Sequence, residues 1–296
     1  MIIWPARFAL LCVAGLLLQG CVAPKQTLDQ DLRSVAGGRD VIVVLEQGEI
    51  RAEFAVASGG GGGGGAIGGA ISALVSEGVN EHRASRAEEN VRPLRDSVSS
   101  YDFDRHALEA TRSALAQIAW FDLKNLSFSK DGSKDKLAST LGQSAASQLL
   151  VARYGYSISR DCQRIALMLD VSIFAKGADK PEDRIASDKA LYTQRFRYVR
   201  KLPGATRRAN QNAALWAAHD GEAARAAFDA GLSMVNDLLV RSLAQTAEAA
   251  DALGQGEMTT IDEEHGKLVE TSAKGTLLYN GRAATWTFID RAAPPG

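Results

Sequence analysis

The sequence of 296 residues has no excess of charge of either sign. Its 34 Lys and Arg residues nearly balance 35 Asp and Glu residues, and the formal net charge is −1. A nucleic-acid-binding protein usually carries a strongly basic domain, so this class is disfavoured. Hydrophobic residues make up 46% of the chain and charged residues 23%, which is ordinary globular usage and argues against a disordered tail or a membrane bundle.

Sequence motifs of catalysis and metal binding are also missing. The chain has only four histidines, and it contains neither His-Glu-x-x-His nor Gly-x-Ser-x-Gly. Residues 262–265, Asp-Glu-Glu-His, lack a defined ligand geometry, so we expect no metal and no cofactor. Distant Ser, His and Asp side chains can still converge in a fold, which leaves a hydrolase as an alternative to the predicted non-enzyme.

What the sequence does contain begins at its N-terminus. Arg7 precedes an apolar run from Phe8 to Leu18, which is shorter than the roughly 20 residues that a membrane-spanning helix needs. A positive region, a short apolar core and small residues before the cut are typical of a secretory signal. The run ends in Leu18-Gln19-Gly20-Cys21, which resembles the lipobox of bacterial lipoproteins.

This resemblance implies that residues 1–20 are removed and that the Cys21 thiol is joined to a diacylglycerol. In that family an Asp after the cysteine commonly retains the protein in the inner membrane, so Val22 favours the outer membrane, with the body facing the periplasm. Cys12 would leave with the signal and Cys21 would be acylated. Cys162 would then be the remaining thiol, and its place before an apolar strand pattern predicts a buried, unreactive side chain.

The periodicity predicts an α+β fold, with an antiparallel sheet (a three-stranded meander plus hairpins) packed with several helices. Residues 150–158, 165–173 and 192–198 alternate apolar and polar side chains and form the expected meander. Residues 41–45 and 50–56 read as an N-terminal hairpin. Helices are expected from residue 66 to Pro93, from Asp102 or Asp104 to Ile118, and over 134–146, and residues 120–128 suggest a further strand. A long helix, or two helices joined near Gly221, is expected within 206–253.

These elements suggest four parts of the chain. Residues 1–20 are the signal, 21–38 a lipidated tether, 39–253 a globular domain with a Gly-rich loop at 59–65, and 254–296 a C-terminal β-ribbon. In the ribbon, Asn280-Gly281 suits a type I′ turn.

The seven glycines at 59–65 match many Gly-rich patterns but lack the Gly-Lys-Ser/Thr ending of a phosphate-binding loop, so a nucleotide site is disfavoured. They suit a flexible loop that leads into a helix. The alternative is close packing or membrane contact by small residues spaced by four, and it resembles a glycine zipper: Gly61, Gly65, Gly69 and Ala73.

A basic segment without acidic residues follows Asp188. Its members could bind an anionic partner, or could simply be a solvated sheet face: Arg195, Arg197, Arg200, Lys201, Arg207 and Arg208. The leading hypothesis is therefore a non-catalytic, lipid-anchored envelope lipoprotein that binds or positions an envelope protein or peptidoglycan. The alternative is a membrane-inserting or pore-forming protein that uses residues 55–76. No nucleic acid is expected, and the oligomeric state is not predicted.

Overall fold

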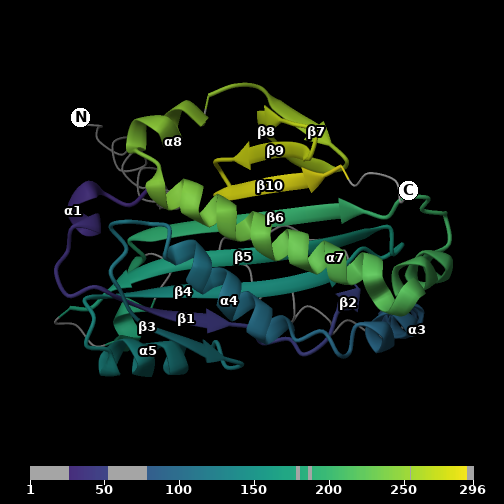
Figure 1. The fold of residues 1–296 in the computed structure, drawn as a ribbon, viewed down its shortest axis with the longest axis horizontal. Helices are drawn as coiled ribbons and strands as arrows, with labels where there is room; N and C mark the ends of the chain where they lie inside the picture. The colour runs from purple at the N-terminus through teal and green to yellow at the C-terminus, as the bar shows by residue number, and fades with distance from the viewer. Residues whose placement is uncertain (1–26, 53–78, 178–180, 186–188, 254, 292–296) are drawn as a thin grey trace, which may run out of the picture.

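The computed structural model describes residues 27–52, 79–177, 181–185, 189–253 and 255–291, and Figure 1 shows their arrangement. These residues form one ten-stranded sheet, in the order β3-β1-β4-β5-β6-β10-β9-β8-β7, with β2 beside β4. The strands are β1 (Arg39–Val44), β2 (Arg51–Ala52), β3 (Leu123–Ser129), β4 (Gln148–Ile158), β5 (Arg164–Ala175), β6 (Tyr192–Lys201), β7 (Met258–Ile261), β8 (Glu264–Thr271), β9 (Gly275–Asn280) and β10 (Thr285–Asp290).

The predicted fold class is wrong about the sheet, although the fold is α+β overall. β4, β5 and β6 do pair antiparallel in sequence order, but they are the centre of a much larger mixed sheet. β1 runs parallel to both β3 and β4, and β10 runs parallel to β6. These parallel pairs join segments about a hundred residues apart, so a local alternation pattern does not reveal them.

The predicted N-terminal hairpin is also wrong. β1 and β2 both run parallel to β4, opposite Gln148–Arg153 and Ser157–Ile158 respectively, so they form one interrupted strand and not a hairpin. The side chain of Gln47 fills the interruption. Its Nε2 donates to the Tyr156 carbonyl at 2.8 Å and its Oε1 accepts from the Tyr156 amide at 3.0 Å, as a neighbouring strand would do.

Helices cover the sheet on both faces. The helices are α1 (Gln30–Arg33), α3 (Val79–Ser97), α4 (Phe103–Leu115), α5 (Lys134–Gln143), α6 (Pro181–Arg184), α7 (Ala209–Ala244) and α8 (Ala247–Leu253). In Figure 1, α3, α4 and α7 lie across the face towards the viewer. They bury Val41, Val43 and Leu150, whereas α5 packs against the alternate side chains, Ile42 and Val44. Alternate residues of one strand point to opposite faces, so the sheet has two separate cores.

A sharp elbow divides α7. Ala218 is extended, and His219, Asp220 and Gly221 follow with φ of 51°, 57° and 73°, in the left-handed region. A Cβ on Gly221 would lie 2.8 Å from Oγ of Ser97, so both the backbone angle and the space require glycine there. The predicted break near Gly221 is thereby confirmed.

The N-terminal segment packs against the body of the protein. Residues 27–38 belong to the expected tether, but Leu28 is buried in the main core. Arg39 lies beneath α1, is almost fully buried, donates to the carbonyls of Leu32 and Arg33, and stacks 4.8 Å from the Trp120 ring. Gln148, at the start of β4, donates to the same Leu32 carbonyl. The chain is therefore held at this corner from Leu28 onward.

The C-terminal strands belong to the same sheet as the rest. β9 and β10 form the predicted hairpin, and β10 extends the central strands by pairing with β6. The turn is not the two-residue type expected from Asn280-Gly281. Asn280 pairs with Thr285, so four residues make the loop, and Ala284 takes the left-handed conformation with φ of 47°.

Candidate functional site

The arginines predicted to bind an anionic partner are largely occupied by carboxylates of the protein itself. Arg195 makes two hydrogen bonds to Asp170 on the adjacent strand, Nε to Oδ1 at 2.7 Å and a second one to Oδ2 at 3.1 Å. Arg197 pairs with Glu264 at 2.8 Å, and Arg200 with Asp290 at 3.6 Å. These half-buried pairs leave β6 with little free positive charge, so the strand itself is a poor anion site.

Asp170 is the centre of a row of alternating charges on the sheet face opposite α7. It lies between Arg153 of β4 and Arg195 of β6, and Arg153 in turn pairs with Glu46 at 3.2 Å. Burial raises the pKa of the Asp170 carboxyl, while the hydrogen bonds and charge of Arg195 oppose that shift. We interpret this row as holding neighbouring strands in register, and not as a binding site.

The acidic segment 262–264 supplies two of the counter-charges. Arg164 of β5 donates to the Asp262 carbonyl and pairs with Glu263 at 2.5 Å, although three strands separate β5 from β8 in the sheet. The β7–β8 hairpin must therefore curl back over the sheet. Within the part of the chain that the structure describes, no group of three or more His, Cys, Asp or Glu side chains could hold a metal ion.

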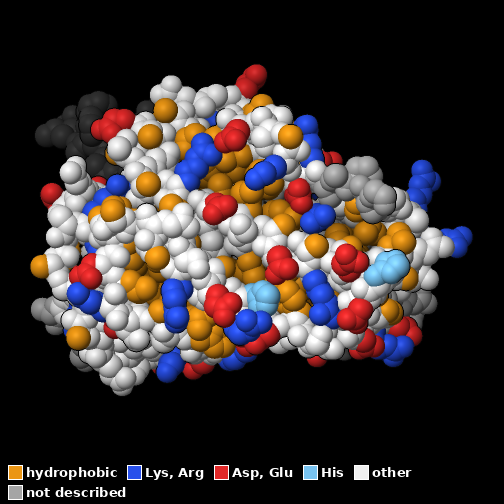
Figure 2. Space-filling model, viewed as in Figure 1, with side chains coloured by type: hydrophobic (Ala, Val, Ile, Leu, Met, Phe, Trp, Pro, Cys, Tyr) orange, Lys and Arg blue, Asp and Glu red, His pale blue; other side chains and the backbone are white. Residues whose placement is uncertain are grey.

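The remaining predicted cations lie at one end of the sheet. Lys201, Arg207 and Arg208 are exposed, and Arg160, in the β4–β5 turn, is exposed at the same end. We call these four residues the basic end. Among the described residues, none of the four has a carboxylate partner. Figure 2 shows Lys and Arg side chains projecting where β6 ends, whereas charges of both signs mix over the rest of the visible face.

Buried hydrogen bonds join the two loops that carry the basic end. The Asn212 side chain is fully buried, and its Nδ2 donates to the carbonyls of Asp161 at 2.8 Å and Thr206 at 2.9 Å. Its Oδ1 accepts from the Thr206 amide at 2.7 Å. Gln163 also donates to the Thr206 carbonyl. The four cations are thus presented on a fixed framework.

Trp216 of α7 adds a further buried hydrogen bond to this framework. Its ring is fully buried, and its Nε1 donates to the Cys162 carbonyl at 2.9 Å. Cys162 adopts φ of 54°, a strained angle for a residue with a Cβ, so its backbone depends on such contacts. Arg160 is not among the cations predicted from the sequence, because it lies outside the basic segment that follows Asp188.

Cys162 is buried, as predicted. Burial and the nearby Asp161 charge raise the pKa of its thiol to about 11, so the thiolate needed for reaction is scarce at neutral pH. A thiol whose pKa is higher in the folded than in the unfolded chain holds its proton longer when folded. Above about pH 9 the thiol ionises more readily in the unfolded chain than in the folded one. The free energy of unfolding therefore falls as the pH rises from about 9 towards 11.

We expect the free energy of unfolding to fall by about 2 kcal/mol from this thiol alone between pH 8 and pH 10.5. Urea unfolding at both pH values measures the loss. The Cys162→Ala variant is the control, because it should lose less on the same change of pH. Equal losses in the two proteins would contradict the assignment.

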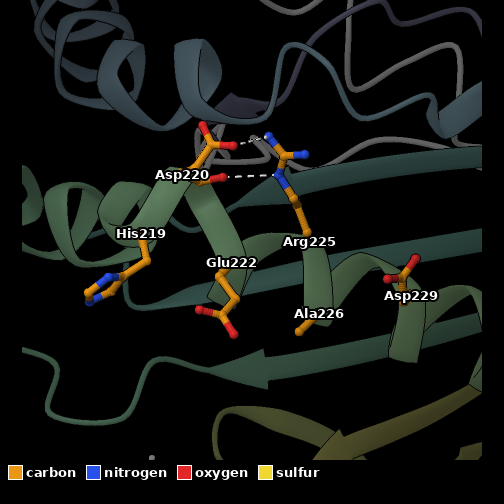
Figure 3. A pocket seen from close by; sticks show the side chains of 6 residues that line it. All are labelled: His219, Asp220, Glu222, Arg225, Ala226 and Asp229. Atoms are coloured by element: carbon orange, nitrogen blue, oxygen red, sulfur yellow. Dashed lines mark hydrogen bonds and ion pairs between the residues drawn. The ribbon is translucent and has the colours of Figure 1, made fainter.

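The outer surface of α7 carries shallow hollows. One of about 310 Å³ lies at the elbow (Figure 3), where Arg225 donates from Nε to the Asp220 carbonyl and pairs with its carboxylate at 3.2 Å. The same guanidinium donates to the Ser97 carbonyl of α3. His219 and Glu222 point away from Arg225 in Figure 3. These side chains hold the elbow and do not converge on a reacting atom.

A second hollow, of about 360 Å³, lies between α4 and α7. Asp229 accepts a 2.6 Å hydrogen bond from the Tyr101 hydroxyl and lies 3.4 Å from Nδ1 of His106. Burial, reinforced by Asp229, raises the pKa of Tyr101, which stays a neutral donor. Nε2 of His106 faces Arg105 at 3.2 Å, so both ring nitrogens have neighbours other than serine. This arrangement does not support Ser-His-Asp catalysis.

Some predicted site residues lie outside the described residues: Cys21, Gly61, Gly65, Gly69 and Ala73. The lipid anchor and the glycine zipper therefore stay predictions. Over the described residues, no helix is both long enough and apolar enough to cross a membrane.

Comparison with known proteins assigns no family. No family model matches the chain, and no curated protein matches it. One similar solved structure is a PelC dodecamer from Paraburkholderia phytofirmans, which shares 10% sequence identity with a TM-score of 0.24 and covers 70% of this chain and 92% of that one. A similarity at this level carries no argument about function.

Proposed function

We propose that this protein is an exported, lipid-anchored and non-catalytic protein of the bacterial envelope, which binds or positions another envelope component. The observation that carries the proposal is the sequence Leu18-Gln19-Gly20-Cys21 after an apolar run of signal length. Two or more acyl chains on Cys21 hold a protein stably at a membrane, because each buried methylene contributes about 0.8 kcal/mol.

The body of the protein is consistent with binding in place of catalysis. In the described part of the chain, the hollows on α7 are shallow, and Arg225 and Asp220, which line the one at the elbow, are paired with each other. The surface that stands out is the basic end, where Lys201 at the end of β6 and three arginines on the loops joined by Asn212 have no carboxylate partner among the described residues. We propose this end, and not the paired arginines of β6, as the binding surface.

The proposal predicts a specific mature N-terminus. The protein extracted from membranes should begin at Cys21 and carry a diacylglycerol, as measured by mass spectrometry of the N-terminal peptide. The Cys21→Ala variant should keep its first 20 residues or appear without lipid. A wild-type protein that begins elsewhere, or has an unmodified Cys21 thiol, would overturn the lipid anchor and with it the proposed location.

A further inference from the structure

We propose that the basic end binds the carboxylates of peptidoglycan, and that it does so at a distance from the membrane that holds the lipid. This inference rests on the proposed function, because it uses Cys21 as the anchor. It adds a partner class and an orientation of the fold relative to the anchoring surface.

The corner where the chain enters the fold lies far from the basic end. Gln148 donates to the Leu32 carbonyl at that corner, and β4 runs from Gln148 to Ile158, just before Arg160. Eleven residues of strand span about 35 Å. β6 ends at Lys201 beside Arg164, at the same far end. The corner at α1, where the chain enters the fold, and the basic end are therefore separated by the full length of strand β4.

The anchor must lie near the α1 corner. The chain between Cys21 and Thr27 is at most about 22 Å long when fully extended. In an orientation in which the strands point away from the anchoring surface, which is part of this proposal, the basic end lies well beyond the Debye length of about 8–10 Å from the head groups. In that orientation, an anionic partner outside the anchoring membrane is closer to the basic end than the lipid head groups are.

The chemistry of the basic end suits a carboxylate polymer. Three of its four cations are arginines, whose planar guanidinium groups bind carboxylates through two hydrogen bonds. Two nearby acidic groups are already engaged. Asp161 accepts from Ser159 and Gln163, and Asp290 accepts from Tyr198 and pairs with Arg200.

A protein partner is less well matched to these loops. Stable protein interfaces usually have an apolar core surrounded by a polar rim. Among the described residues, the large exposed apolar side chains are those of Val35, Leu215, Met258 and Leu268, and none lies in residues 159–163 or 202–208. An extended polymer with repeated carboxylates needs no such core, because spaced charge contacts hold it.

The test is sedimentation of the full chain carrying Cys21→Ser with purified peptidoglycan sacculi, compared with vesicles of phosphatidylglycerol. The variant reverses all four cations: Arg160→Glu, Lys201→Glu, Arg207→Glu and Arg208→Glu. A matched control reverses four exposed cations elsewhere: Arg112→Glu, Lys134→Glu, Lys136→Glu and Arg282→Glu. A neutral version with four Gln substitutions guards against loss of folding, and urea unfolding checks each protein.

We expect wild type and control to bind sacculi, and the basic-end variant to bind at least roughly tenfold more weakly, with the Gln version between them. No binding by wild type, or an equal loss in the control, would overturn the proposal. Vesicle binding as tight as sacculus binding, with the same loss in the variant, would assign the surface to lipid instead. None of these results bears on the mass of the mature N-terminus, so the anchor stands or falls separately.

Discussion

Replacing Trp216 with Ala should lower the free energy of unfolding by about 3–5 kcal/mol, as measured by urea denaturation. The ring is fully buried between α7 and the sheet, and its removal leaves a large cavity. It also leaves the Cys162 carbonyl without its 2.9 Å donor, at a residue whose φ of 54° needs support. Loss of packing and loss of a buried hydrogen bond act together here.

The Trp216→Phe variant separates these two contributions. Phe keeps most of the apolar volume but cannot donate, so it should cost about 1–2 kcal/mol. A matched comparison is Leu215→Ala on the same helix, because Leu215 is 43% exposed and should cost less than about 1 kcal/mol. If Trp216→Ala were as mild as Leu215→Ala, the packing of α7 described above would be incorrect.

Neutralising Asp170 should cost about 3 kcal/mol of stability, again by urea denaturation. The Asp170→Asn substitution keeps the shape of the side chain but leaves Arg195 and Arg153 as like charges on either side of an uncharged group. Arg195 loses two charge-assisted hydrogen bonds while its side chain stays two-thirds buried. The charged Arg195 guanidinium then stays partly buried without the carboxylate that offsets its desolvation.

A double-mutant cycle with Arg195→Met tests whether the loss belongs to the pair. The double variant removes both the charge and the unpaired donor, so it should be more stable than the sum of the two single losses implies, by at least about 1 kcal/mol. Glu270 with Arg241 is the control pair, because both side chains are about half exposed and their coupling should be below about 1 kcal/mol. Additive losses for Asp170 and Arg195 would show that the charge row does not hold the strands.

The sequence predicts local elements well because their signals lie within short windows. The alternation in β4, β5 and β6 is visible residue by residue, and so are the cap before α4, where Asp102 accepts from the Arg105 amide, and the break at Gly221. Pro93 was expected to end its helix, yet α3 continues to Ser97. Packing of α3 against the core at Val91 and Leu94 outweighs the local preference of proline.

The assembly of the sheet could not be predicted in the same way. The neighbours of β1 are Leu123–Ser129 and Gln148–Arg153, and nothing in residues 39–44 specifies them. A short run such as Val41–Leu45 followed by Gln47-Gly48 suits a hairpin as well as it suits a parallel strand. The choice depends on the helices that bury both sides of β1, with α3, α4 and α7 on one face of the sheet and α5 on the other.

The proposed binding surface could not be predicted from the basic segment of the sequence alone. Composition identified the cations of residues 195–208, but their carboxylate partners come from β5, β8 and β10. Only the fold distinguishes Arg195, which is paired with Asp170, from Arg207, which has no carboxylate partner in the described part of the chain. Arg160 joined the surface because the β4–β5 turn lies beside the β6–α7 loop, a neighbourhood that linear spacing does not encode.

The interrupted strand formed by β1 and β2 carries the chain in one direction along β4. Gln47 bridges the gap and the chain does not reverse its direction there. Residues 39–52 therefore run along the whole length of β4, from Gln148 to Ile158. Ala52 therefore departs from the sheet on the side of Arg160, opposite to the point of entry. The chain therefore enters the sheet at the Gln148 end of β4 and leaves it after Ala52 at the Ile158 end.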